Sequence, residues 1–212
     1  MIKLILLILL ITFAFCVLHP VTTVEGVKSK DDKQCREYEC KQPTVSDPNL
    51  KVELIHQWNG AVSSMAFLGH DILILDKNNG KVNSIINGNI VDTPLLDVNV
   101  ANKRERGLLG ISVPHSNNNT KHVYLYYTES KNTDGSDICS DATGRYLCEP
   151  GTEPLGNRLY RYELAGTKLV NPKLLLNLPV TPGPAHNGGV IQIGPDNNIY
   201  VTIGDLNNKK QL

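Results

Sequence analysis

A strand–turn–strand module that recurs along the chain constrains the fold more than any other feature. Residues 65–77 (MAFLGHDILILDK) and 191–205 (IQIGPDNNIYVTIGD) share one plan: an apolar strand, a Gly-x-Asp turn, and a second apolar strand followed by Asp. Residues 111–129 (ISVPHSNNNTKHVYLYYTE) are a looser copy with a longer turn. No stretch from residue 51 onward sustains a helical period over three turns. The pattern predicts an all-β chain.

The spacing of these modules is typical of propeller blades. Phe67 and Val113 stand 46 residues apart, within the roughly 40 to 50 residues of a four-stranded blade. We expect one blade at 50–97, a second at 105–177, and a third that begins at Gly188. Because two to three blades cannot close a ring and bury their faces, we expect the chain to be the N-terminal portion of a larger β-propeller.

The N-terminal residues indicate export. Residues 1–23 place an apolar run behind a single lysine, which predicts a signal peptide or a membrane anchor. A secreted or extracytoplasmic location follows, with anchoring by this segment as the alternative to cleavage. Residues 24–50 are polar and interrupted by two prolines, as expected of a linker. Residues 51–212 make up the expected partial propeller.

The cysteines agree with export. Beyond the leader they form two close pairs, Cys35/Cys40 in the linker and Cys139/Cys148 in an insertion of the second blade. Each pair is expected to close a small disulfide loop in an oxidising compartment. A zinc site is the alternative, but neither pair has CxxC spacing. The 21 basic and 21 acidic residues balance, which leaves no electrostatic footprint for a nucleic acid.

His186 and Asp205 stand at the two ends of one predicted hairpin. His186 precedes the strand 190–193, and Asp205 follows the strand 199–203. Because these ends are neighbours in an antiparallel pair, we expect the two side chains to meet at the mouth of a central channel. An imidazole bonded to a carboxylate is held in one tautomer and made more basic, as a general base requires. The alternative is that both are turn residues without a catalytic role.

Other residues near these positions carry weaker expectations. Gly188 and Gly189 are expected to let a ligand approach the backbone closely. Arg104 and Arg106 flank Glu105, and surface ion pairs are favoured over an anion site for them. Five tyrosines on predicted strands are expected to pack within blades rather than to form a sugar platform: Tyr124, Tyr126, Tyr127, Tyr160 and Tyr162.

Four segments of the chain resemble the glucose/sorbosone dehydrogenase family in their order and spacing. They are PLLDVNV (94–100), ERGLLGISV (105–113), NRLYRYEL (157–164) and HNGGVIQIGPDNNIYVTIGD (186–205). This family comprises secreted six-bladed propellers, including soluble quinoprotein glucose dehydrogenases and aldose sugar dehydrogenases. The resemblance covers about residues 55–212, and it implies a six-bladed fold of which this chain holds about the first half.

The resemblance also implies a chemistry, the oxidation of an aldose at its anomeric carbon to a lactone. Pyrroloquinoline quinone (PQQ) would bind in the central channel, with Ca²⁺ polarising the quinone. His186 would be the general base and contact the cofactor, and Asp205 would orient His186. Glu105 lies where some members use a glutamine to contact PQQ. The cationic PQQ clamp and the main Ca²⁺ ligands are expected beyond residue 212, and the sugar and the electron acceptor stay unidentified.

Two departures from the family pattern keep alternatives open. Val190 stands where bacterial glucose dehydrogenases have an arginine, and Glu105 stands where they have a glutamine. One alternative is therefore a non-catalytic extracellular propeller that binds a protein or carbohydrate partner. Another is a Ca²⁺-dependent lactonase-like propeller, which needs several carboxylates and an asparagine around the channel. Asp205 is the one good candidate for that ring.

Overall fold

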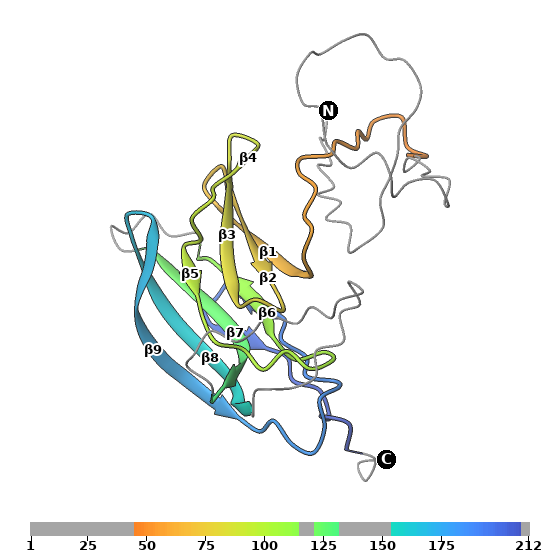
Figure 1. Cartoon of the computed structure of the whole chain (residues 1–212). Coiled ribbons are helices and arrows are strands. Elements are labelled where there is room, and N and C mark those ends of the chain that lie inside the picture. Colours follow the sequence, from red (N-terminus) through yellow and green to blue (C-terminus); the bar gives the residue numbers. More distant parts are fainter. Residues whose placement is uncertain (1–44, 115–120, 132–153, 209–212) are drawn as a thin grey trace, which may run out of the picture. The chain divides into compact units, whose positions relative to one another are not determined.

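The computed structural model describes residues 45–114, 121–131 and 154–208 (Figure 1). The predicted leader and both cysteine pairs lie outside these residues. The chain divides into two compact units, residues 1–59 and residues 60–212. In the first unit, the described residues 45–59 contain no strand, and their backbone turns between Asp47 and Leu50. No helix in the described ranges is long and apolar enough to cross a membrane.

The first sheet of the second unit is antiparallel and contains five strands: β1 (Val62–Leu68), β2 (Asp71–Asp76), β3 (Lys81–Ile86), β4 (Asn89–Ile90) and β5 (Leu96–Asp97). Both β4 and β5 pair with β3, so together they fill the place of one fourth strand. Pro94 lies between them, and a proline lacks the N–H that a continuous ladder needs. Asn87 and Gly88 both have positive φ, as the two-residue turn between β3 and β4 requires.

The second sheet has four antiparallel strands, β6 (Leu108–Ser112), β7 (His122–Ser130), β8 (Pro154–Ala165) and β9 (Lys168–Leu178). A separate hairpin follows, made of β10 (Ile191–Ile193) and β11 (Ile199–Val201). Most of β7 is buried, whereas β9 is largely exposed. Strand β7 is therefore covered on both faces, and for that reason its sequence shows little alternation of apolar and polar residues.

The first strands of the two sheets and of the hairpin pack side by side, because β6 contacts β1 and also contacts β10. Radial repetition of four-stranded sheets about a channel produces this arrangement. The strands of the two sheets cover residues 62–97 and 108–178, and the hairpin begins at residue 191. These ranges are close to those of the three blades expected from the repeat. The all-β propeller prediction is confirmed.

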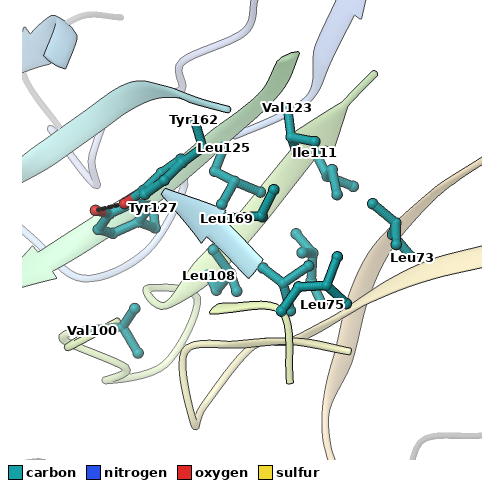
Figure 2. Packing of buried hydrophobic residues seen from close by; sticks show 12 residues of the cluster. Leu73, Leu75, Val100, Leu108, Ile111, Val123, Leu125, Tyr127, Tyr162 and Leu169 are labelled. Atoms are coloured by element: carbon teal, nitrogen blue, oxygen red, sulfur yellow. Dashed lines mark hydrogen bonds between the residues drawn. The ribbon is translucent and has the colours of Figure 1, made fainter. Parts of the chain in front are cut away.

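A hydrophobic core fills the space between the first two sheets (Figure 2). Leu73 and Leu75 of β2 face Leu108 of β6 and Leu125 of β7 across it, and all four side chains are fully buried. Burying one such side chain contributes about 1.5–3 kcal/mol. A smaller cluster, built on Tyr126, packs the β10–β11 hairpin against the other face of the second sheet.

The tyrosines belong to this packing, as predicted. Tyr127 is buried and stacks on Tyr160, with ring centroids 5.3 Å apart. Its hydroxyl is 3.1 Å from the hydroxyl of Tyr162, the contact drawn as a dashed line in Figure 2. Burial raises the pKa of Tyr127 and keeps its hydroxyl protonated. Tyr124 and Tyr126 belong to the cluster on the opposite face of the sheet.

Candidate catalytic site

The β10–β11 hairpin brings His186 and Asp205 together. Two backbone hydrogen bonds continue the ladder past the strands, from Gly189 N to Thr202 O (2.9 Å) and from Thr202 N to Val190 O (3.0 Å). The segments that carry the two residues therefore run side by side. His186 Nδ1 lies 2.7 Å from Asp205 Oδ1, so the residues meet as expected from their places in the hairpin.

The electrostatics of the pair define its tautomer. The hydrogen bond and then the charge of Asp205 raise the pKa of His186, with a smaller contribution from Glu105. The hydrogen bond from His186 and that from the Asn207 N–H lower the pKa of Asp205. An ionised carboxylate only accepts hydrogen bonds, so Nδ1 donates and Nε2 of the neutral imidazole keeps its lone pair.

Both side chains of the pair are open to solvent. The exposed fraction is 57% for the His186 side chain and 45% for the Asp205 side chain. An exposed imidazole with a lone pair on Nε2 can take a proton from a hydroxyl, and the carboxylate behind it can stabilise the imidazolium that forms. The arrangement is thus chemically competent for general-base catalysis.

Glu105 lies at the same site but contacts the backbone of His186 rather than its imidazole. Its carboxylate accepts a hydrogen bond from the His186 N–H, and its own N–H donates to Pro184 O at 3.3 Å. His186 has a φ of 58°, a left-handed conformation that is uncommon outside glycine. The bond from Glu105 helps to hold the backbone in this conformation.

Arg106 does not form the surface ion pair expected for it, and this expectation was wrong. The side chain is buried, and its guanidinium donates hydrogen bonds to Val180 O and Gly183 O. Both carbonyls belong to the segment that leads into His186. Arg106 therefore anchors this segment through one terminal nitrogen, Nη2, whereas its buried Nε has no hydrogen-bond partner among the described residues.

The glycines after His186 make close contacts within the protein. A Cβ on Gly188 would lie 2.5 Å from Thr202 O, and one on Gly189 would lie 2.7 Å from Leu109 Cβ. The space beside both residues is filled by the protein itself. Their lack of a side chain lets the hairpin close and pack on β6.

Lys77 is a residue near the site that sequence reasoning missed. Burial lowers its pKa to about 8, and the charges of Asp76 and Glu105 partly oppose this shift. Lys77 directly follows Asp76, the counterpart of Asp205 in the first strand–turn–strand module. Comparison of the modules could have found this cation, because it directly follows the residue that corresponds to Asp205.

The residues described at the site do not by themselves fit the cofactor implied by the resemblance. PQQ carries three carboxylates and needs cationic partners, whereas the groups described here are two carboxylates, one imidazole and one half-buried lysine. Within the described ranges, no three His, Cys, Asp or Glu side chains gather as a metal site would require.

Comparisons with known proteins agree with the fold. The model of the family "Glucose / Sorbosone dehydrogenase" matches residues 61–212. No curated protein matches the chain. Among solved structures, a Thermus thermophilus protein assigned as an oxidoreductase (glucose dehydrogenase) is 26% identical, with a TM-score of 0.53 over 70% of this chain and 39% of its own.

Two further solved structures have lower identity and bear on the fold alone. The PQQ-bound form of an aldose sugar dehydrogenase from Streptomyces coelicolor is 23% identical, with a TM-score of 0.53 over 70% of this chain and 39% of its own. A glucose dehydrogenase is 17% identical, with a TM-score of 0.55 over 70% of this chain and 42% of its own. The chain thus spans about two fifths of the length of the structures it matches.

Proposed function

The chain belongs to the glucose/sorbosone dehydrogenase family, and from this premise we propose that the protein oxidises aldose sugars at the anomeric carbon to lactones. The cofactor would be PQQ, as in the bound form of the Streptomyces coelicolor enzyme. The observation that carries the proposal is the exposed His186–Asp205 pair at the end of the β10–β11 hairpin. Family membership supports the reaction class, and the pair supports the proton transfer.

The reaction removes a proton from the anomeric hydroxyl and a hydride from the anomeric carbon, and the carbonyl of the lactone forms. The residues of this chain account for the proton. Nε2 of His186 accepts it, while Nδ1 keeps its bond to Asp205. The carboxylate stabilises the imidazolium and keeps the ring from rotating. The raised pKa of His186 makes the imidazole a stronger base.

PQQ, when bound, supplies the two-electron acceptor, and Ca²⁺ would polarise it. The cationic clamp and the Ca²⁺ ligands are proposed to lie on blades other than those described here. Glu105 would contact the cofactor, although its carboxylate also accepts the His186 N–H. We also propose that the protein is exported, with the leader either cleaved or kept as an anchor. Each of the two cysteine pairs would then form a disulfide.

A binding propeller without catalysis is the second candidate. Val190, where bacterial glucose dehydrogenases carry an arginine, is apolar and 65% exposed close to His186. Glu105 adds a negative charge where some members of the family have a glutamine. Both features weaken an anionic cofactor site and favour a surface for a protein or carbohydrate partner. Failure of the full-length protein to bind PQQ in the presence of Ca²⁺ would favour this candidate.

The test is steady-state oxidation of aldoses by the full-length protein with PQQ, Ca²⁺ and an artificial electron acceptor. We expect turnover, and we expect His186→Ala to lower kcat by about a hundred- to ten-thousandfold, the usual contribution of a general base. His70→Ala is the matched control, because His70 is an exposed histidine in the β1–β2 turn. A His186→Ala protein with the wild-type rate would contradict the mechanism.

A further inference from the structure

A buried chain of polar side chains runs beneath the His186 loop. Thr128 of β7, Asn157 of β8 and Asn187 of the loop are each at most 1% exposed. Thr128 Oγ1 donates to Asn157 Oδ1 at 2.6 Å, and Asn157 Nδ2 donates to Asn187 Oδ1 at 3.2 Å. This series of hydrogen bonds thus connects two strands of the second sheet to the residue that follows His186.

The amide of Asn157 is held in one orientation. Its Nδ2 also donates to Pro179 O at 3.0 Å, so its amide group faces two acceptor oxygens, while its Oδ1 accepts the hydroxyl of Thr128. A flipped amide would set its oxygen against two acceptor oxygens, Pro179 O and Asn187 Oδ1. Pro179 and Asn187 lie on the two sides of the loop segment, so one side chain connects both.

Asn187 in turn holds the backbone beside His186. Its side-chain Nδ2 donates a hydrogen bond to Pro184 O at 2.8 Å, and its backbone carbonyl accepts one from the hydroxyl of Tyr126 at 3.2 Å. Buried amides cost free energy unless they are paired, and apolar side chains would fill the same space. What this chain of bonds adds is a fixed position, because each bond demands a specific length and direction.

A fixed position matters here because His186 has a left-handed backbone conformation, with φ at 58°. A non-glycine residue leaves this region unless its neighbours hold it. Relaxation to an ordinary φ would turn the Cα–Cβ bond and move the imidazole away from Asp205. Asn157 acts on this conformation through Asn187 on one side, and Glu105 bonds the His186 N–H on the other.

We propose that Asn157 is a positioning residue for His186: through Asn187 it keeps the imidazole in contact with Asp205. Its effect on turnover rests on the proposed function, whereas its effect on the imidazole does not. Asn157 contacts neither His186 nor the solvent, and it acts only through the loop.

The test is a titration of His186 by NMR in the full-length protein labelled with ¹³C-histidine, with kcat and KM for an aldose measured in parallel. The chain contains six histidines, and the signal lost in His186→Ala identifies the one of interest. Asp205 and Glu105 are the charged groups that act on this ring, and Lys77 acts on Glu105. In the wild type we expect a His186 pKa above 6.5.

In Asn157→Leu we expect the His186 pKa to fall toward 6.5, because contact with Asp205 is no longer maintained. We also expect kcat to fall by up to about a hundredfold, the effect of small misplacements at reacting groups, with KM little changed. Thr128→Val removes only the hydroxyl that orients the amide. It should fold even if Asn157→Leu does not, and should move both quantities in the same direction by less.

The matched control is Val123→Ala, which makes a cavity on the opposite face of β7, in the core shared with the first sheet. It should lower stability and leave the His186 pKa unchanged. A His186 pKa that stays at the wild-type value in the Asn157 and Thr128 variants would overturn the proposal, and so would an unchanged kcat in an active protein. A wild type that oxidises no aldose would refute the proposed function, while the titration would still decide the role of Asn157.

Discussion

Replacing Gly110 of β6 with alanine tests how tightly the His186 loop is positioned. A Cβ on Gly110 would lie 1.8 Å from Gly189 O and 3.1 Å from Ile191 Cγ1. Real Cβ atoms do not approach other atoms within 3.0 Å, so the carbonyl of Gly189 would have to move by about 1.2 Å. This carbonyl belongs to the backbone three residues after His186, and the Cα of the same residue packs against Leu109, whose Cβ would lie 2.7 Å from a Cβ on Gly189.

We therefore expect Gly110→Ala to displace the imidazole and lower kcat by about a hundredfold. Overpacking of this kind also lowers the free energy of unfolding by about 1–3 kcal/mol. The assay is aldose oxidation by the full-length protein, with urea unfolding of the same sample. Ile111→Val is the control, since Ile111 is the next residue on β6 and packs in the core between the sheets. It should cost about 0.5–1.5 kcal/mol without loss of turnover. A folded Gly110→Ala protein with the wild-type kcat would refute the reasoning.

Three further predictions concern stability. Arg106→Met should lower the free energy of unfolding by about 2–4 kcal/mol, because two buried carbonyls lose their donor; an unchanged urea midpoint would contradict it. Tyr127→Phe should cost about 1 kcal/mol through the lost bond to Tyr162, whereas equal stability would show that the buried hydroxyls do not interact. His186→Ala should lower the melting temperature most between pH 3.8 and 6.5. Because the pKa of His186 is raised, its contribution to stability is complete below pH 6.5 and is lost as pH rises through the raised pKa. Because the pKa of Asp205 is lowered, its contribution is complete above pH 3.8 and is lost as pH falls through the lowered pKa. A difference that does not change with pH would argue against the pair.

The parts of the fold that the sequence predicts are those set by neighbouring residues. The strands of each blade follow from apolar runs separated by turn residues, and the blade spacing follows from their repetition. The meeting of His186 and Asp205 follows in the same way, because both flank one hairpin and its register is set by local pairing. Their catalytic role is a further step that sequence and geometry support together and that activity measurements must test.

The parts that could not be predicted depend on packing between blades. Arg106 is buried because carbonyls more than seventy positions away lie around its guanidinium, and its sequence neighbours give no sign of this. Asn157 and Asn187 are thirty positions apart, one on β8 and the other in the loop before β10. Gly189 packs against Leu109 of the preceding sheet. Each depends on how one blade sits against the next, which no local pattern encodes.

The most direct measurement of the central claim is the pH dependence of kcat/KM for an aldose, compared with the NMR titration of His186 in the same full-length protein. In the proposed mechanism the neutral imidazole is the active form, so kcat/KM should rise with pH through a single inflection that coincides with the His186 pKa, above 6.5. Asp205→Asn should move both the inflection and the titration toward lower pH and lower the plateau, because the ring loses its partner. An inflection that differs from the titration of His186, or that stays in place when Asp205 is replaced, would contradict the account.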